Sequence, residues 1–246
     1  VGSHCFSFKT CNSIGALGEN AANIKNLIKT NTLFNSLIQS GEVHSSTIIA
    51  HTRWASVGKV NLYNTHPVEY VCKKNQFGFP KISSILNGDI YNYNEIISNA
   101  KKDYSFSIDT SIYSNDCVAV PAFLSDIQDI SIHNFVEMSN SFSGSFIIAV
   151  THSQKPEDIY ILKKGIQGLY LGFAYDGAMF ASDVYGLVET CKYFKSVTTD
   201  KAFLLSSMQN NFYEDISISL IDTKTEKGTP ILKKDLKKTN ITTRDI

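Results

Sequence analysis

The chain has 246 residues, of which 43% are hydrophobic, and it carries 23 basic and 23 acidic side chains. This balance leaves no excess positive charge for a nucleic acid backbone, and no apolar run reaches the roughly 20 residues of a membrane span. We therefore expect a well-cored cytoplasmic protein whose partners include neither nucleic acid nor membrane.

The first predicted element is helical. Apolar residues recur at three- and four-residue steps between residues 19 and 40, and Gly41 stands where a helix would stop. The pattern predicts either one helix or two helices broken near Asn31.

Two short β-rich runs follow, at residues 46–50 and 81–86, and we expect them to share a sheet. The stretch NGDIYNYNEIISNA then predicts a turn at Asn87-Gly88, followed by a short helix.

A second helical region is predicted after Asp116, where Pro121 should delay or kink the helix because proline has no N–H to donate. Another helix is expected over residues 131–139. Four closely spaced strands come next, in GSFIIAV, DIYILKK, GLYLGFAY and GAMFAS. Ser182 is then placed to cap a helix, and YEDISISLID alternates as a final strand.

The order of these elements favours an α+β fold. Strands and helices come in blocks rather than in strict alternation, which is typical of layered antiparallel sheets covered by helices. Past Asp222 the chain becomes rich in lysine and poor in apolar residues, so we expect a domain over residues 1–222 and a linker over residues 223–246.

Three separate stretches could converge on one small polar ligand. Arg53 could clasp an α-carboxylate, and Asp116 could pair with an α-ammonium group. The Asn87 amide and the Gly88 N–H could donate to an oxyanion. Each residue also has an ordinary interpretation: an ion-paired arginine, a helix cap and a hairpin turn.

Metal and cofactor chemistry have little support in the sequence. The five cysteines are scattered and the six histidines show no metal-ligand spacing, so we expect neither a metal nor another cofactor. His51 and His66 are interpreted as structural histidines.

Several motifs resemble the glutaminase domain of class II (N-terminal nucleophile) glutamine amidotransferases. HTRWASVG is similar to the family's H-T-R-W-A-T-H-G, NTHP to N-A-H-P, and ILNGDIYNY to V-H-N-G-I-I-E-N-Y. The likeness is strongest to the members that make glucosamine 6-phosphate. It implies a four-layer αββα sandwich with an incomplete N-terminal edge.

The resemblance also implies a role for each matching residue. It assigns Arg53 to the glutamine carboxylate, Trp54 to a pocket wall, Ser56 to a substrate hydrogen bond and Asp116 to the glutamine amino group. Asn87 and Gly88 match the oxyanion hole. The binding partner implied is L-glutamine.

The nucleophile of this family is an N-terminal cysteine whose own α-amino group acts as the base. The opening residues of this chain resemble the interior of the family's domain, so we expect the nucleophile to lie outside the chain and ammonia release to be low. Cys5 is the rival candidate, and a strand cysteine is its ordinary interpretation.

The resemblance implies that the domain supplies ammonia for glucosamine 6-phosphate synthesis from fructose 6-phosphate and glutamine. A sugar-phosphate isomerase domain would follow in the same full-length chain, and the protein would form a homo-oligomer. The alternatives are a non-catalytic amino-acid-binding or scaffolding remnant, and a glutaminase like that of asparagine synthetase.

Overall fold

The computed structural model describes most of the chain, in segments separated by short gaps. The described residues are 4–11, 18–43, 46–53, 58–70, 82–102, 112–125, 127, 129–174, 177–191, 193–198, 200–207, 216–222 and 228–231. None of the helices in these segments is both long and apolar enough to cross a membrane.

Six α-helices and two 3₁₀ turns are present in the described residues. They are α1 (Glu19–Thr30), α2 (Thr32–Gln39), η1 (Leu62–Asn64), α3 (Tyr93–Lys102), η2 (Asp116–Val118), α4 (Ala119–Leu124), α5 (Ile132–Ser141) and α6 (Tyr185–Val188).

The described segments contain ten strands in two sheets, and each pair of neighbouring strands among them is antiparallel. The large sheet has the order β1 (Val68–Tyr70), β2 (Ile82–Ile90), β3 (Gly144–His152), β4 (Lys155–Lys164), β8 (Lys201–Ser207), β9 (Ile216–Asp222) and β10 (Gly228–Ile231). The small sheet has the order β6 (Ala178–Ala181), β5 (Tyr170–Phe173) and β7 (Tyr193–Ser196).

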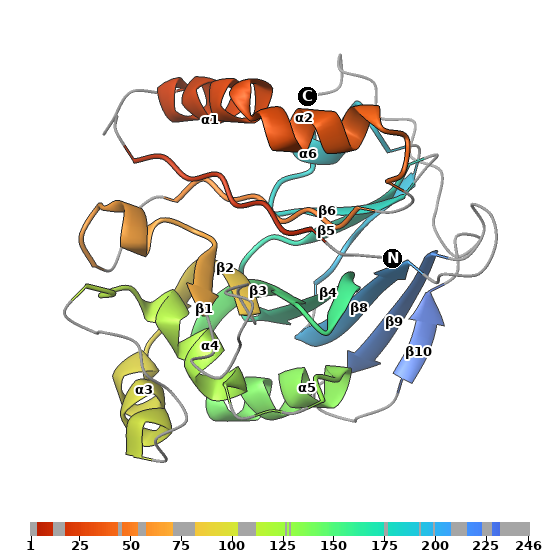
Figure 1. The fold of residues 1–246 in the computed structure, drawn as a ribbon. Coiled ribbons are helices and arrows are strands. Elements are labelled where there is room, and N and C mark those ends of the chain that lie inside the picture. Colours follow the sequence, from red (N-terminus) through yellow and green to blue (C-terminus); the bar gives the residue numbers. More distant parts are fainter. Residues whose placement is uncertain are drawn as a thin grey trace.

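The elements stack in four layers (Figure 1). Helices α3, α4 and α5 cover one face of the large sheet, the small sheet lies against the other face, and α1, α2 and α6 lie beyond it. Neighbouring residues of β3 show the two cores, because side chains alternate between the faces of a strand. Ile148 is buried against the helices, and Ile147 is buried between the sheets. The αββα sandwich is thereby confirmed.

Of the two alternatives for the first helical region, the structure shows two helices rather than one. Asn31 separates α1 from α2, and its side-chain oxygen accepts the Phe34 N–H at 2.8 Å, which caps the second helix. The ring of Phe34 packs edge-on against Phe6 and Phe8, so the N-terminal segment lies against α2.

Two predictions in the β region are wrong. Residues 46–50 form no ladder, so they do not share a sheet with β2. Asn87 and Gly88 do not form a turn, because β2 stays paired with β3 up to Ile90 and the chain turns at residues 91–92. The long ladder overrides the local turn signal.

The second half of the chain needs smaller corrections. Ser182 does not cap α6. Its N-cap is Val184, and Asp183 Oδ1 accepts the Tyr185 N–H at 2.9 Å. The sequence prediction missed β1, β7 and β8. Four residues of the expected linker form β10 at the edge of the large sheet, and the domain boundary at residue 222 stays a prediction.

Candidate active site

The site lies where, among the described residues, no strand pairs with one edge of β2. Strand β1 pairs only with residues 82–84, whereas β2 continues to Ile90. N–H groups along a strand point alternately to its two edges. The N–H groups of Leu86, Gly88 and Ile90 therefore face the open edge together.

Two of these three N–H groups are bound by side chains. Ile90 donates to Asp116 Oδ2 at 2.9 Å, and Leu86 donates to His66 Nδ1 at 3.4 Å. Gly88 lies between these two positions. Gly88 also lines the space that the two side chains enclose.

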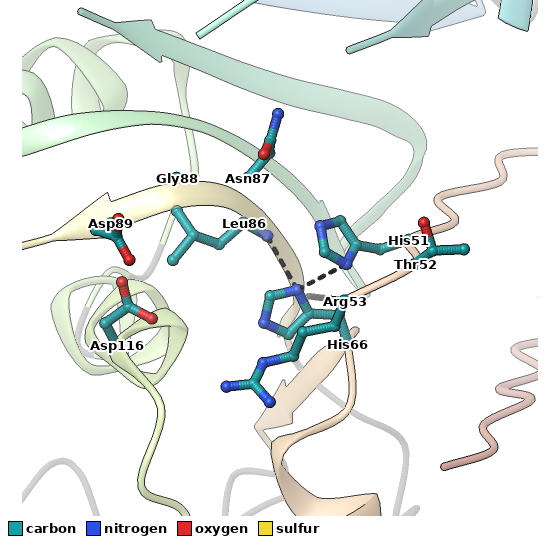
Figure 2. Close-up of a pocket in the computed structure, with 9 residues that line it drawn as sticks. All are labelled: His51, Thr52, Arg53, His66, Leu86, Asn87, Gly88, Asp89 and Asp116. Atoms are coloured by element: carbon teal, nitrogen blue, oxygen red, sulfur yellow. Dashed lines mark hydrogen bonds between the residues drawn. The ribbon is translucent and has the colours of Figure 1, made fainter. Parts of the chain in front are cut away.

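This space is a cavity of about 240 Å³, slightly below the roughly 300–1,000 Å³ of pockets for drug-sized ligands. Figure 2 shows the nine residues that line it. They are His51, Thr52, Arg53, His66, Leu86, Asn87, Gly88, Asp89 and Asp116. A cavity of this size fits a single small metabolite.

A buried asparagine fixes the two loops that carry His66 and Asp116. The Asn64 side-chain nitrogen donates to Ser114 Oγ at 2.9 Å, and its oxygen accepts the Ser114 N–H at 2.8 Å. The Asn64 carbonyl also accepts from Asn115 Nδ2 at 3.0 Å. These bonds cross about 50 residues of sequence and hold the loops together at the edge of β2.

Asp116 is the buried acidic group of the pocket, with 5% of its surface exposed. Its position is set by η2, where Asn115 Oδ1 caps the turn by accepting the Val118 N–H. Burial, with a smaller effect of the Asp89 charge, raises the pKa of Asp116, while the Ile90 N–H and the Arg53 charge oppose this rise.

Charges of both signs face the cavity. Figure 2 shows the Arg53 guanidinium on the same side of β2 as the Asp116 carboxylate, and the Asp89 carboxylate directed toward Asp116. The Asn87 side chain points away from Arg53 and Asp116. The pocket thus has a charged end and an amide-bearing end, as a zwitterion with a polar side chain would require.

Gly88 is the one position in β2 that needs glycine. Its φ is +103°, which L side chains rarely adopt. A Cβ built there would overlap the Ser145 carbonyl oxygen and approach Phe146 Cα to 2.9 Å. The neighbouring strand therefore packs directly against the Gly88 backbone.

Two imidazoles line the pocket beside Arg53. His51 Nδ1 and His66 Nδ1 are 3.2 Å apart. Burial, together with the charges of His51 and Arg53, lowers the pKa of His66 to about 2. Burial and the Arg53 charge lower the pKa of His51 to about 4. Both rings are therefore neutral at neutral pH.

None of the described cysteines lines the cavity. Cys5 is an exposed residue whose thiol is partly covered by its surroundings, and this partial burial, together with the Glu69 charge, raises the pKa of the thiol. Cys117 is fully buried against Ser84, and its burial raises its pKa to about 12. A raised pKa is the opposite of what an activated thiol shows.

The structure brings together four of the predicted residues, Arg53, Asn87, Gly88 and Asp116. Trp54 and Ser56 lie outside the described residues. Sequence reasoning missed the other lining residues, which are His51, Thr52, His66, Leu86 and Asp89. The two histidines stand inside the HTRW and NTHP motifs, so a signal for them was present.

No family model matches the chain. Among curated relatives, the glutamine–fructose-6-phosphate aminotransferase (isomerizing) of Thermotoga maritima is 29% identical over 182 residues, which cover 73% of this chain and 28% of that protein. The protein of the same name from Thermococcus kodakarensis is 32% identical over 154 residues, covering 60% and 23%. The chain spans about a quarter of the length of these relatives.

Solved structures show the same fold. The glutamine phosphoribosylpyrophosphate amidotransferase of B. subtilis matches with a TM-score of 0.51 and 14% identity, over 68% of this chain and 35% of that one. A second structure, an allosteric regulatory enzyme of purine biosynthesis, matches with the same TM-score and identity over 64% and 32%. These two matches show the fold of this chain.

Proposed function

We propose that this chain, a class II glutamine amidotransferase domain, binds L-glutamine in the β2-edge pocket and releases its side-chain nitrogen as ammonia. One observation carries the proposal. A guanidinium, two carboxylates and the edge N–H of Gly88 share one small cavity. This set complements both the zwitterionic end and the amide end of glutamine.

The charged end of the pocket would bind the amino-acid backbone. Arg53 can hold the α-carboxylate with two parallel N–H donors, a geometry that lysine cannot reproduce. Asp116 would accept from the α-ammonium group, and Asp89 adds a second negative charge beside it. By resemblance, Trp54 and Ser56 would complete the wall and add a hydrogen bond.

The amide end would stabilise the reaction intermediate. When a thiolate adds to the amide carbon, the carbonyl oxygen becomes an oxyanion, and donors fixed beforehand lower the energy of this state. The Asn87 amide and the Gly88 N–H are the proposed donors. The amide nitrogen then leaves as ammonia after taking up a proton, and water hydrolyses the thioester to glutamate.

The attacking thiol is the part of the mechanism that the described cysteines do not supply to the pocket. Cys5 is exposed and its pKa is raised, so a thiolate there is disfavoured at neutral pH. We therefore keep Cys5 as the weaker candidate. The N-terminal cysteine implied by the resemblance remains the stronger one.

The acceptor of the ammonia is proposed from the relatives. Several curated relatives are named glutamine–fructose-6-phosphate aminotransferases. We infer that this domain serves the synthesis of an amino-sugar phosphate, with fructose 6-phosphate as acceptor and an isomerase domain as its partner in a homo-oligomer.

The test uses the gene product that contains this chain and glutamine labelled with ¹⁵N in the side-chain amide. The proposal predicts ¹⁵N in glucosamine 6-phosphate when fructose 6-phosphate is present, and loss of this transfer in Arg53→Met. Transfer to aspartate in the presence of ATP would instead favour the asparagine-synthetase-like alternative. Absence of label from every product would refute hydrolysis.

A second candidate function is amino-acid binding without hydrolysis. It is favoured by the absence of the described cysteines from the pocket lining. The two candidates differ in one measurement. A non-catalytic binding domain would bind L-glutamine and release no ammonia in the gene product, and Arg53→Met would abolish the binding.

A further inference from the structure

The two pocket histidines contact each other and the same backbone segment. His66 Nδ1 accepts the Leu86 N–H at 3.4 Å and lies 3.2 Å from His51 Nδ1 (Figure 2). A backbone hydrogen bond with Leu86 also acts on His51. Both histidines therefore contact the Leu86 backbone at the open edge of β2.

Leu86 directly precedes the two residues that would stabilise an oxyanion. Beyond residue 84, β1 no longer supports this edge of β2. In the described part of the chain, the histidine pair contacts this edge at Leu86 and Asp116 contacts it at Ile90. Asn87 and Gly88 lie between these two contacts, so a shift at Leu86 would tilt both groups.

We propose that His51 and His66 form a neutral positioning pair that holds Leu86, and thereby sets the direction of the Asn87 side chain and the Gly88 N–H. Neither imidazole is assigned a proton transfer to substrate. This proposal rests on the proposed glutamine amidotransferase function. The geometry of the histidine pair can nevertheless be tested without any substrate.

The contact between the rings holds a single proton. Two facing Nδ1 atoms at 3.2 Å form a hydrogen bond only if one ring donates and the other accepts. A second proton would place two N–H groups against each other. Arg53 faces both rings and Lys9 acts on His66, and both charges disfavour this second proton.

The first test measures the backbone directly by NMR in the protein without ligand. His66→Leu removes the acceptor for the Leu86 N–H, whereas His66→Asn keeps an acceptor oxygen near the Nδ1 position. We expect the Gly88 amide resonance to move in His66→Leu and to return toward its normal position in His66→Asn. L-glutamine should bind about tenfold more weakly to the leucine variant than to the asparagine variant.

A matched control is available in β3, the strand that pairs with β2. His152 is also buried, with 2% of its surface exposed, but it lies opposite Ile82, at the other end of β2. His152→Asn should leave the Gly88 resonance and glutamine binding unchanged. An unmoved Gly88 resonance in His66→Leu, or an equal shift in His152→Asn, would overturn the proposal.

The second test needs no substitution and covers the case in which His66→Leu does not fold. Imidazole ¹⁵N shifts of the wild-type protein should show both rings neutral down to about pH 5, and the Gly88 amide should shift together with the first protonation below that pH. Protonation of either ring near its ordinary value of about 6.5, with a fixed Gly88 amide, would contradict the pair. If the Gly88 shifts appear but glutamine does not bind, the positioning holds and the proposed function fails.

Discussion

Asp116 Oδ2 accepts the backbone N–H of Ile90 at 2.9 Å, which ties the turn after Asn115 to the open edge of β2. The bond holds the Asp116 carboxylate at the pocket that Gly88 also lines. Because burial raises the pKa of Asp116, the negative charge is held at a cost to the fold. Such a cost is expected of a group that serves a ligand.

Replacing Asp116 with asparagine should separate binding from folding. Asp116→Asn keeps an oxygen that can accept the Ile90 N–H but removes the charge that would face the α-ammonium group. Loss of a charged hydrogen-bond partner costs about 1.5–3 kcal/mol, so L-glutamine should bind roughly 10- to 100-fold more weakly by calorimetry. Asp158 is the matched control, because its carboxylate is also buried and accepts a hydrogen bond from the Tyr160 hydroxyl. The Asp158→Asn variant should bind glutamine normally.

The same variant should change how stability depends on pH. A carboxyl group whose pKa is raised by folding contributes stability below its unfolded pKa of about 3.9, and this contribution is lost as pH rises through the folded value. Asp116→Asn should therefore have a higher free energy of unfolding than the wild type at neutral pH, with the difference shrinking toward pH 4. Urea denaturation across this range measures it, and a less stable variant at neutral pH would contradict the assignment.

Gly88→Ala should damage both the fold and the pocket. The new Cβ meets the Ser145 carbonyl and also forces a residue with a side chain to adopt a positive φ. Gly41→Ala is the matched control, because Gly41 has a φ of +73° with nothing within 4 Å. The control should cost about 1–2 kcal/mol of unfolding free energy, and Gly88→Ala should cost clearly more. Equal losses would mean that β3 does not constrain Gly88.

Cys5 should behave as an unactivated thiol. Because its pKa is raised, alkylation by iodoacetamide should be slow at pH 7 and should still be accelerating above pH 9. Saturating L-glutamine should give no protection, because Cys5 does not line the pocket. Mass spectrometry of the modified peptide measures both rates. Fast alkylation at pH 7 that glutamine suppresses would make Cys5 the nucleophile.

Local signals in the sequence predicted the features that depend on local chemistry. The break at Asn31 was one of two alternatives open from the sequence, and it depends on a local contact, because an asparagine cap acts on a residue three positions away. The block order of strands gave the layered architecture, and the motif resemblance predicted that Arg53 and Asp116 would meet. The structure places both residues in the same cavity.

Features that depend on distant partners were not predictable in this way. Asn87-Gly88 reads as a hairpin turn, and only the ladder with β3 shows that it belongs to a strand. The roles of His51 and His66 depend on which ring nitrogens meet, which no spacing in the sequence reveals. The strand β8 was missed because its own short sequence pattern does not predict a strand. It forms a strand through pairing with β4 and β9, which lie on either side of it in the sheet.

The central claim is that the β2-edge pocket recognises L-glutamine, and a calorimetric titration with L-glutamine tests it most directly. Arg53→Met removes the proposed carboxylate ligand, and Lys25→Met removes the same charge from an exposed position on α1 as the control. We predict saturable binding that Lys25→Met preserves and Arg53→Met weakens at least about tenfold. No saturable binding by the wild-type protein, or equal binding by the two variants, would contradict the account.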